Sequence, residues 1–118
     1  MKFLMFIKHD DKNYGQPPKR LMDAMEKFVG SSLATGKLKD TGGLFPAKKS
    51  TFIQSKGGKV TVKDGPFTES KEVVGGYALV ETNTREEALE LAREFMELHR
   101  VHWPEFECIS EVRQVEEF

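Results

Sequence analysis

Three histidines are the side chains of this chain best suited to acid–base chemistry. His99 and His102 lie three positions apart, and His9 follows an alternating apolar segment in phase with its inward positions. An imidazole exchanges protons near neutral pH and can ligate a metal ion. We take all three as candidate catalytic groups. For His99 and His102 the alternatives are a structural role at a helix end, a ligand pocket or a metal site. Because no third ligand lies near them in sequence, we predict no metal.

A second chemical feature is the stretch VTVKDGPFTESKEVVGGYALVE, residues 60–81. Pro66 lacks an N–H and disfavours the helical conformation at Gly65, so the chain must leave a strand ladder here. Asp64 can accept hydrogen bonds from the amides that follow it, as in an Asx turn. Phe67 offers a large apolar body that would hold the loop down. These features fit either a turn between two strands or one wall of a site.

The pair Gly75-Gly76 lies inside an apolar segment that otherwise reads as a buried strand. Glycines in a strand mark a bulge, or a place where another backbone or a ligand comes close. Both interpretations stay open, the first including a contact with a second copy of the chain. If the space is a pocket, Lys71 can receive an anion and Tyr77 can offer a hydroxyl. Otherwise Lys71 is solvated or paired. The pocket candidates from this stretch are Asp64, Phe67, Lys71, Gly75, Gly76 and Tyr77.

Composition describes one ordinary globular domain over residues 1–118. Hydrophobic residues make up 38% and charged residues 31%, and the longest apolar run near the start, FLMFI, is too short to cross a bilayer. A single cysteine, Cys108, excludes an intrachain disulfide and suits a cytoplasmic location. Cys108 fits a semi-buried strand position better than a nucleophile. Phosphate-binding and nucleophile motifs do not appear, so we expect no cofactor.

Charge is distributed unevenly although the net charge is −1. Lysine and arginine exceed the acids before residue 60, and the acids dominate afterwards. The basic residues are scattered lysines without interleaved aromatics, which argues against nucleic acid as a partner. We expect the two halves, or two copies of the chain, to pack on each other.

Hydrophobic periodicity predicts six strands and two helices. Residues 2–8 are apolar on both alternating sets, which indicates a strand buried on both faces. A helix should begin at Pro17-Pro18 and end at Gly36. A second should begin at Thr84, with Glu87 in capping-box spacing, and end before Pro104. The remaining strands are expected at 37–45, 50–55, 59–63, 73–81 and 107–115.

The resulting order is β-α-β-β-β-β-α-β, an α+β ferredoxin-like β-α-β-β-α-β pattern with an extra hairpin. Two helices can cover only one face of such a sheet. Because the first strand is apolar on both sides, we predict a homodimer in which the second face meets another copy of the chain.

The segment VTVKDGPFTESKEVVGGY resembles the signature of the DGPF branch of the YCII-related family, which consists of small bacterial proteins. The likeness extends to MKFLMFI, ATGKL, GGLFP and TREEALELA. This resemblance implies a dimeric ferredoxin-like α+β barrel with a cleft between helices and sheet or at the dimer contact. It implies little about activity: most members have no assigned reaction, some are encoded beside sigma factors, and a few relatives act as dehydrochlorinase-type lyases.

YCII-related proteins thought to be enzymes are similar in pairing a first-helix histidine with an aspartate near the following strand. The first helix of this chain has no histidine, and Met25 occupies the inward position that matches best. Asp40 lies near the expected aspartate without a clear correspondence. Met25 therefore joins the pocket candidates, and the family's acid–base pair is not carried over.

Three functions follow from these observations. The first is binding of a small molecule in a cleft of the dimer, in a signalling context. The second is a lyase or dehydrochlorinase that uses His9, His99 or His102. The third is a protein-interaction module, for example for a sigma factor. The missing acid–base pair favours binding.

Overall fold

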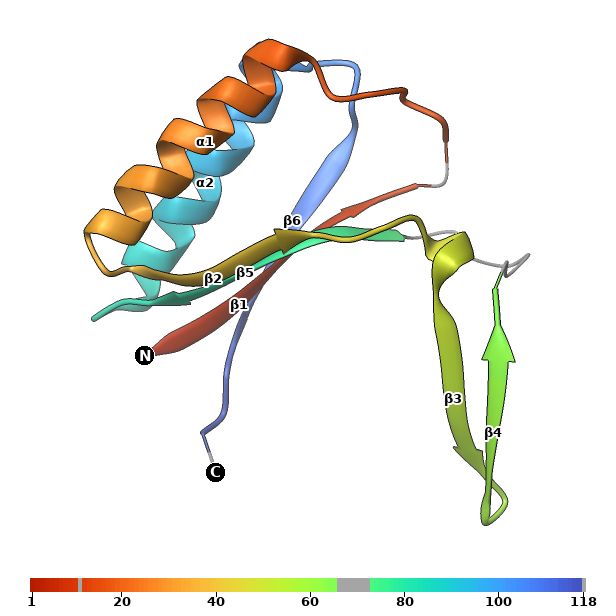
Figure 1. The fold of residues 1–118 in the computed structure, drawn as a ribbon. Coiled ribbons are helices and arrows are strands. Elements are labelled where there is room, and N and C mark those ends of the chain that lie inside the picture. The colour runs from red at the N-terminus through yellow and green to blue at the C-terminus, as the bar shows by residue number, and fades with distance from the viewer. Residues whose placement is uncertain (11, 66–72, 118) are drawn as a thin grey trace.

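The computed structural model describes residues 1–10, 12–65 and 73–117 (Figure 1). The elements follow the predicted order, with one short 3-10 turn added after the second strand. In chain order they are β1 (Lys2–His9), α1 (Lys19–Ala34), β2 (Leu38–Gly43), η1 (Ala47–Lys49), β3 (Thr51–Lys56), β4 (Lys59–Asp64), β5 (Val73–Glu81), α2 (Arg85–His102) and β6 (Cys108–Gln114).

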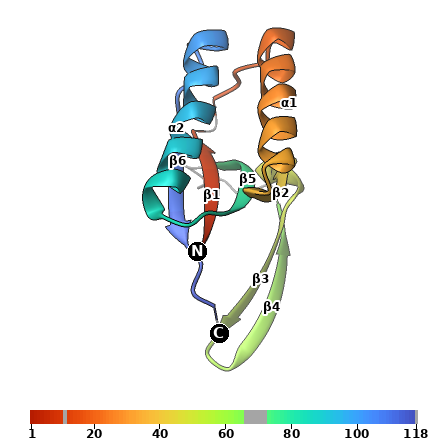
Figure 2. The same ribbon diagram turned by 90° about the vertical axis from the view of Figure 1, so that its left-hand side faces the viewer.

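The main sheet has the order β2-β5-β1-β6, and its neighbouring strands are antiparallel. Both helices lie side by side on one face of this sheet (Figures 1 and 2). The predicted α+β ferredoxin-like fold is confirmed. Strands β3 and β4 form a separate two-stranded sheet, which is the predicted extra hairpin.

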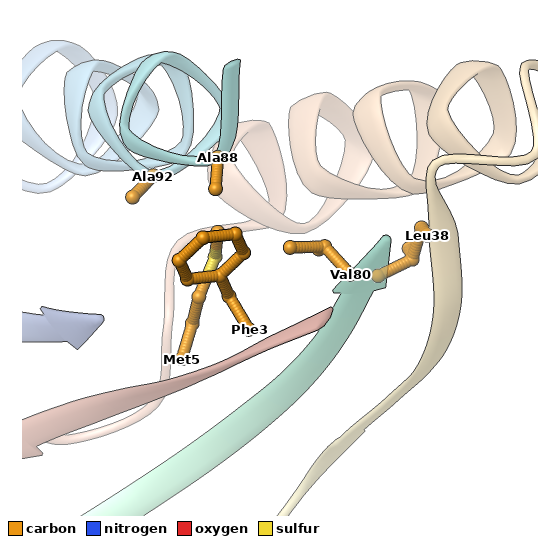
Figure 3. Packing of buried hydrophobic residues seen from close by; sticks show 6 residues of the cluster. All are labelled: Phe3, Met5, Leu38, Val80, Ala88 and Ala92. Carbon is orange, nitrogen blue, oxygen red and sulfur yellow. The ribbon is translucent and has the colours of Figure 1, made fainter. Parts of the chain in front are cut away.

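The core lies between the sheet and α2. Phe3 and Met5 project from the same side of β1, because alternate residues of a strand share a face. They meet the small side chains of Ala88 and Ala92, which let α2 approach the sheet closely (Figure 3). Val80 is also buried in this cluster. Each large apolar side chain buried in this way stabilises the fold by about 1.5–3 kcal/mol.

Local sequence signals set the ends of the helices. The Thr84 hydroxyl accepts a hydrogen bond from the Glu87 amide at 3.2 Å, so the predicted cap of α2 is confirmed. Pro18 precedes the first residue of α1. Gly36 follows the end of α1 with a φ of +77°, a left-handed conformation in which a glycine is favoured.

Strand β5 contains a bulge at the glycine pair. Ile7 of β1 pairs with Gly76, and Lys8 pairs with Val74, so Gly75 has no partner residue on β1. An unpaired extra residue bends the strand locally and re-aims the side chains near it. The bulge expected from the sequence is therefore present.

The second face of the sheet carries apolar side chains beside charged ones, among them the Lys8–Glu111 ion pair. Leu4 pairs with Leu79 and Phe6 with Tyr77, and these positions alternate with the core residues. Ile109 on β6 has 65% of its surface exposed. Within the described ranges, no helix covers this face, which we call the open face.

Strands β3 and β4 form an arm of residues 51–64 that projects from the body on the side opposite the helices (Figures 1 and 2). Gly57 and Gly58 both have positive φ, at +59° and +75°, as the tightest hairpin turns require. All residues of the two strands are exposed. In the described part of the chain, the extensive contacts of each arm strand are with the other.

Candidate functional site

A cavity of about 1270 Å³ lies between the two helices and the sheet. Both central strands and both helices contribute to its wall, as do the segment before α1 and the segment after β2. Lining residues include Ile7, Met25, Gly43, Val73 and Phe95. The volume is sufficient for a small organic ligand, and a mostly apolar wall is typical of such sites.

Aromatic rings close one end of this cavity. Trp103 and Phe106 stack with ring centres 4.4 Å apart and planes at 12°. Tyr14 meets Phe106 edge to face at 4.9 Å. Sequence reasoning did not select Tyr14 or Phe106, because neither belongs to a periodic element. Trp103, the residue that follows α2, lines the cavity as part of this aromatic wall.

Two histidines that are distant in sequence approach the same ring. The imidazole of His9 lies 5.2 Å from the ring centre of Phe106, and that of His99 lies 6.2 Å from it. His9 comes from the end of β1 and His99 from the last turns of α2. Both line the cavity. The fold therefore brings two of the three candidate catalytic groups to one wall.

The protonation pattern of both rings follows from their hydrogen bonds. The Nδ1 of His9 lies 2.6 Å from the carbonyl oxygen of Asp10, and the Nδ1 of His99 lies 3.0 Å from that of Phe95. A carbonyl oxygen only accepts, so each Nδ1 carries the proton and donates. In a neutral ring, each Nε2 then holds a lone pair that can accept a hydrogen bond or a proton.

His99 lines the cavity and is 7% exposed, and its Nε2 keeps some exposed surface. Among the described residues, no fully buried side-chain nitrogen or oxygen lacks a hydrogen-bond partner. Nε2 has no partner there, since the ring bonds only through Nδ1. The atom must therefore be open to solvent, and the cavity is the space that the ring lines.

The bulge in β5 makes room for His9. A Cβ on residue 75 would stand 3.0 Å from Nε2 of His9 and 3.1 Å from its Cδ2. At these distances the ring or the strand would have to shift by a few tenths of an ångström, so a glycine favours the observed position of His9. A Cβ on residue 76 would stand 3.2 Å from the carbonyl oxygen of Gly42.

Asp10 connects His9 to the aromatic wall. Its carbonyl accepts from the His9 ring, and its carboxylate accepts from the hydroxyl of Tyr14 at 2.9 Å. Desolvation raises the pKa of Tyr14, and the bond to Asp10 raises it further. For Asp10 itself, desolvation is outweighed by the bonds from Tyr14 and the Lys12 amide, which lower its pKa. The carboxylate thus stays ionised and holds the tyrosine in place.

The side chain of Tyr77 lies on the opposite face of the sheet. Its backbone borders the cavity, but its pairing with Phe6 places the side chain on the open face. There its hydroxyl donates to the Asp40 carboxylate at 3.0 Å, and this bond raises the pKa of Tyr77. Asp40 therefore acts as a partner of Tyr77 on the open face.

The remaining sequence candidates are dispersed. Met25 and Gly76 line the cavity, and His102 is absent from the described lining. Asp64 lies in the arm and accepts from the Thr51 hydroxyl at 2.7 Å, while the Gly65 amide donates to the Ser50 carbonyl. Phe67 and Lys71 lie outside the described residues.

Cys108 is half-buried, and desolvation raises the pKa of its thiol, which disfavours the reactive thiolate. The described residues contain no group of three histidine, cysteine, aspartate or glutamate side chains placed to hold a metal ion. They also contain no helix of the length and apolar character that a membrane span requires.

Sequence comparison relates this chain to a known domain family and to a bacterial protein. The profile of the YCII-related domain matches residues 1–97. An uncharacterized protein of Rhizobium meliloti (strain 1021) is 31% identical over 75 residues, which cover 64% of this chain and 60% of that protein. The matched region thus spans less than two thirds of that relative.

Proposed function

The chain belongs to the YCII-related family, and on that premise we propose that it binds a small molecule in the cavity between its helices and its sheet. The ligand is a compact, largely apolar or aromatic molecule that carries at least one hydrogen-bond donor. Its apolar part packs on the wall formed by Trp103, Phe106 and Phe95. Its donor group bonds to Nε2 of His9 or His99.

One observation carries this proposal: two imidazole acceptors that have no hydrogen-bond partner among the described residues line a wall that is otherwise aromatic. Binding sites for small molecules combine a large apolar surface with a few polar groups that fix orientation. The direction of each Nε2 is fixed, because Nδ1 of the same ring donates a hydrogen bond to a backbone carbonyl. A ring fixed in this way gives a ligand a directed acceptor with little loss of side-chain entropy.

Family membership also bears on the branch of the family, the oligomeric state and the cellular role that we propose for this chain. The stretch from residue 60 to 77 supports placement in the DGPF branch, although its residues 66–72 lie outside the described ranges. The apolar residues of the open face support a homodimer with sheets face to face. A cytoplasmic location and a role in signalling complete the proposal. The cleft proposed here lies within one chain, between its own helices and sheet.

A lyase of the dehydrochlorinase type is the second candidate, favoured by the same two imidazoles. Nε2 of His9 or His99 can act as a general base if a substrate C–H lies within hydrogen-bond reach. Binding ranks first because α1 presents Met25 where resemblance to the enzymes calls for a histidine.

A titration of ¹⁵N-labelled protein with phenol and with toluene tests the binding proposal. The two molecules are similar in size, and only phenol has a hydroxyl donor. We expect phenol to shift the amide signals of residues around His9 and His99, and to bind roughly fivefold more tightly than toluene. Equal binding of both, or shifts elsewhere alone, would reject it.

A further inference from the structure

The β3–β4 arm has two chemically different faces. Ile53 pairs with Val62, and Ser55 pairs with Val60, so these four side chains share one face. The three apolar members are 66–71% exposed. On the other face, Gln54 pairs with Thr61, Phe52 with Lys63 and Lys56 with Lys59, so this face is basic and polar with one aromatic ring. One side of the arm is thus an apolar surface that the rest of the described chain leaves uncovered.

An arm of this kind is expected to need a partner surface. A two-stranded hairpin is marginally stable alone in water, and further strands or a packing layer are required to hold it. Contiguous exposed apolar surface marks an interaction site. The root of the arm gives it a fixed base, because the Gly65 amide bonds to the Ser50 carbonyl at 2.9 Å.

The direction of the arm indicates which surface of the chain lies beside it. It projects on the side of the sheet opposite the helices, so the arm and the open face form two sides of one concave corner (Figures 1 and 2). A protein that packs on the open face would therefore contact the arm as well. The apolar residues Leu4, Phe6 and Ile109 on the open face match the apolar side of the arm.

The dimensions fit a second copy of this chain. Six residues of strand extend roughly 20 Å, whereas two packed sheets lie about 10 Å apart. The arm is therefore long enough to pass the edge of a second sheet and reach the level of its helices. Its tip carries Lys56 and Lys59, and α2 exposes acidic side chains that include Glu90 and Glu94. Within one chain, the sheet separates the arm from α2 (Figure 1).

We propose that the β3–β4 arm is a clasp for a second copy of this chain. Each arm packs Ile53, Val60 and Val62 on the copy seated against the open face, and its lysine tip lies near exposed glutamates of α2 in that copy. The inference rests on the proposed homodimer and goes beyond it, because sheets can pair face to face without any contribution from the arm. Leu44 to Lys48, which lead into the arm, also line the cavity, so clasping would fix one wall of the binding site.

Paired charge substitutions on the two faces test the clasp in the full-length chain. One variant combines Ile53→Lys with Val62→Lys, which are partners on the apolar face. The control combines Gln54→Lys with Thr61→Lys, which are partners on the other face. Both variants place two lysines opposite each other in the arm. The control pair joins Lys56, Lys59 and Lys63 on its face, so repulsion within the arm is at least as large in the control, and circular dichroism checks the fold of each.

Sedimentation equilibrium then gives the dimer dissociation constant. We expect the native chain to dimerise at micromolar concentration, the apolar-face variant to weaken the dimer at least ~10-fold, and the control to stay within about threefold. Equal dimer stability in all three chains would overturn the clasp and leave the homodimer standing. A monomeric native chain would overturn both.

Hydrogen exchange of the native chain provides a second readout that needs no substitution. Amides of residues 51–64 should become more protected as the dimer fraction rises with concentration. Exchange of these amides that is independent of concentration, in a chain that does dimerise, would also overturn the clasp.

Discussion

The Nε2 of His9 lies 3.0 Å from the position that a Cβ on Gly75 would occupy. The glycine and the histidine are coupled, because the bulge removes Gly75 from the ladder and the missing side chain leaves space for the ring. Gly75, which interrupts the pairing of β5 with β1, thus helps to position one of the two imidazoles that line the cavity.

Substitution of Gly75 by alanine should displace His9. The added Cβ stands too close to the ring, so we expect a loss of about 1–3 kcal/mol in the free energy of unfolding, measured by urea denaturation. The imidazole signals of His9 should shift in NMR spectra. Gly43→Ala is the matched control, because a Cβ at this cavity-lining glycine meets no atom within 4 Å. If both variants have the same stability, the coupling of Gly75 to His9 is refuted.

The cap of α2 should contribute measurably to stability. Thr84→Ala removes the hydroxyl that accepts from the Glu87 amide, and we expect a loss of about 1 kcal/mol by thermal or urea unfolding. Thr84→Ser keeps the hydroxyl and should lose only a few tenths of that amount. A serine variant as unstable as the alanine variant would show that the hydrogen bond is not the cause.

The Tyr14–Asp10 hydrogen bond should make stability depend on pH. The pKa of Asp10 is lowered in the folded chain, so its contribution is present above the ordinary carboxyl pKa and is lost as pH falls through the lowered value. Tyr14→Phe keeps the ring and removes the donor. We expect the urea midpoints of the native and Tyr14→Phe chains to differ at pH 7 and to converge as pH falls through the lowered pKa of Asp10. A difference of constant size across this range would argue against the ionised carboxylate as the acceptor that matters.

Cys108 should react slowly with alkylating agents. Burial raises the pKa of its thiol, and only the thiolate is nucleophilic. At pH 7.5 we expect iodoacetamide to modify the folded chain at least ~10-fold more slowly than the urea-unfolded chain, with a rate that rises at higher pH. Equal rates would mean that the folded chain leaves the thiol accessible with ordinary reactivity, and a faster rate in the folded chain would return it to the candidate nucleophiles.

Sequence reasoning predicted the fold well, because each element carries its own signal. The alternation around Phe3 and Met5, the cap at Thr84 and the glycine turn at Gly57 act over a few residues. The α+β order, the helix ends and the hairpin follow from such local signals. The bulge at Gly75 was also foreseeable, since a glycine pair inside a strand has few other uses.

The candidate site was predictable only in part, because it depends on contacts between distant segments. His9 and His99 were selected by phase, yet their meeting at Phe106 needs the register of β1 with β6 and the position of α2. Tyr14 and Phe106 lie outside periodic elements, so no sequence pattern pointed to them. Asp64 was grouped with the pocket on the basis of its motif, and it lies in the arm with Thr51 instead.

The most direct test of the central claim is the phenol titration repeated on matched histidine variants. His99→Phe removes the acceptor at the cavity, and His102→Phe makes the same change on the same helix at a position outside the described lining. NMR titration gives the affinity of each chain for phenol and toluene. We predict that the preference for phenol, roughly fivefold in the native chain, falls toward unity in His99→Phe and persists in His102→Phe. An undiminished preference in His99→Phe and in His9→Phe, or no binding of phenol to the native chain, would contradict the account.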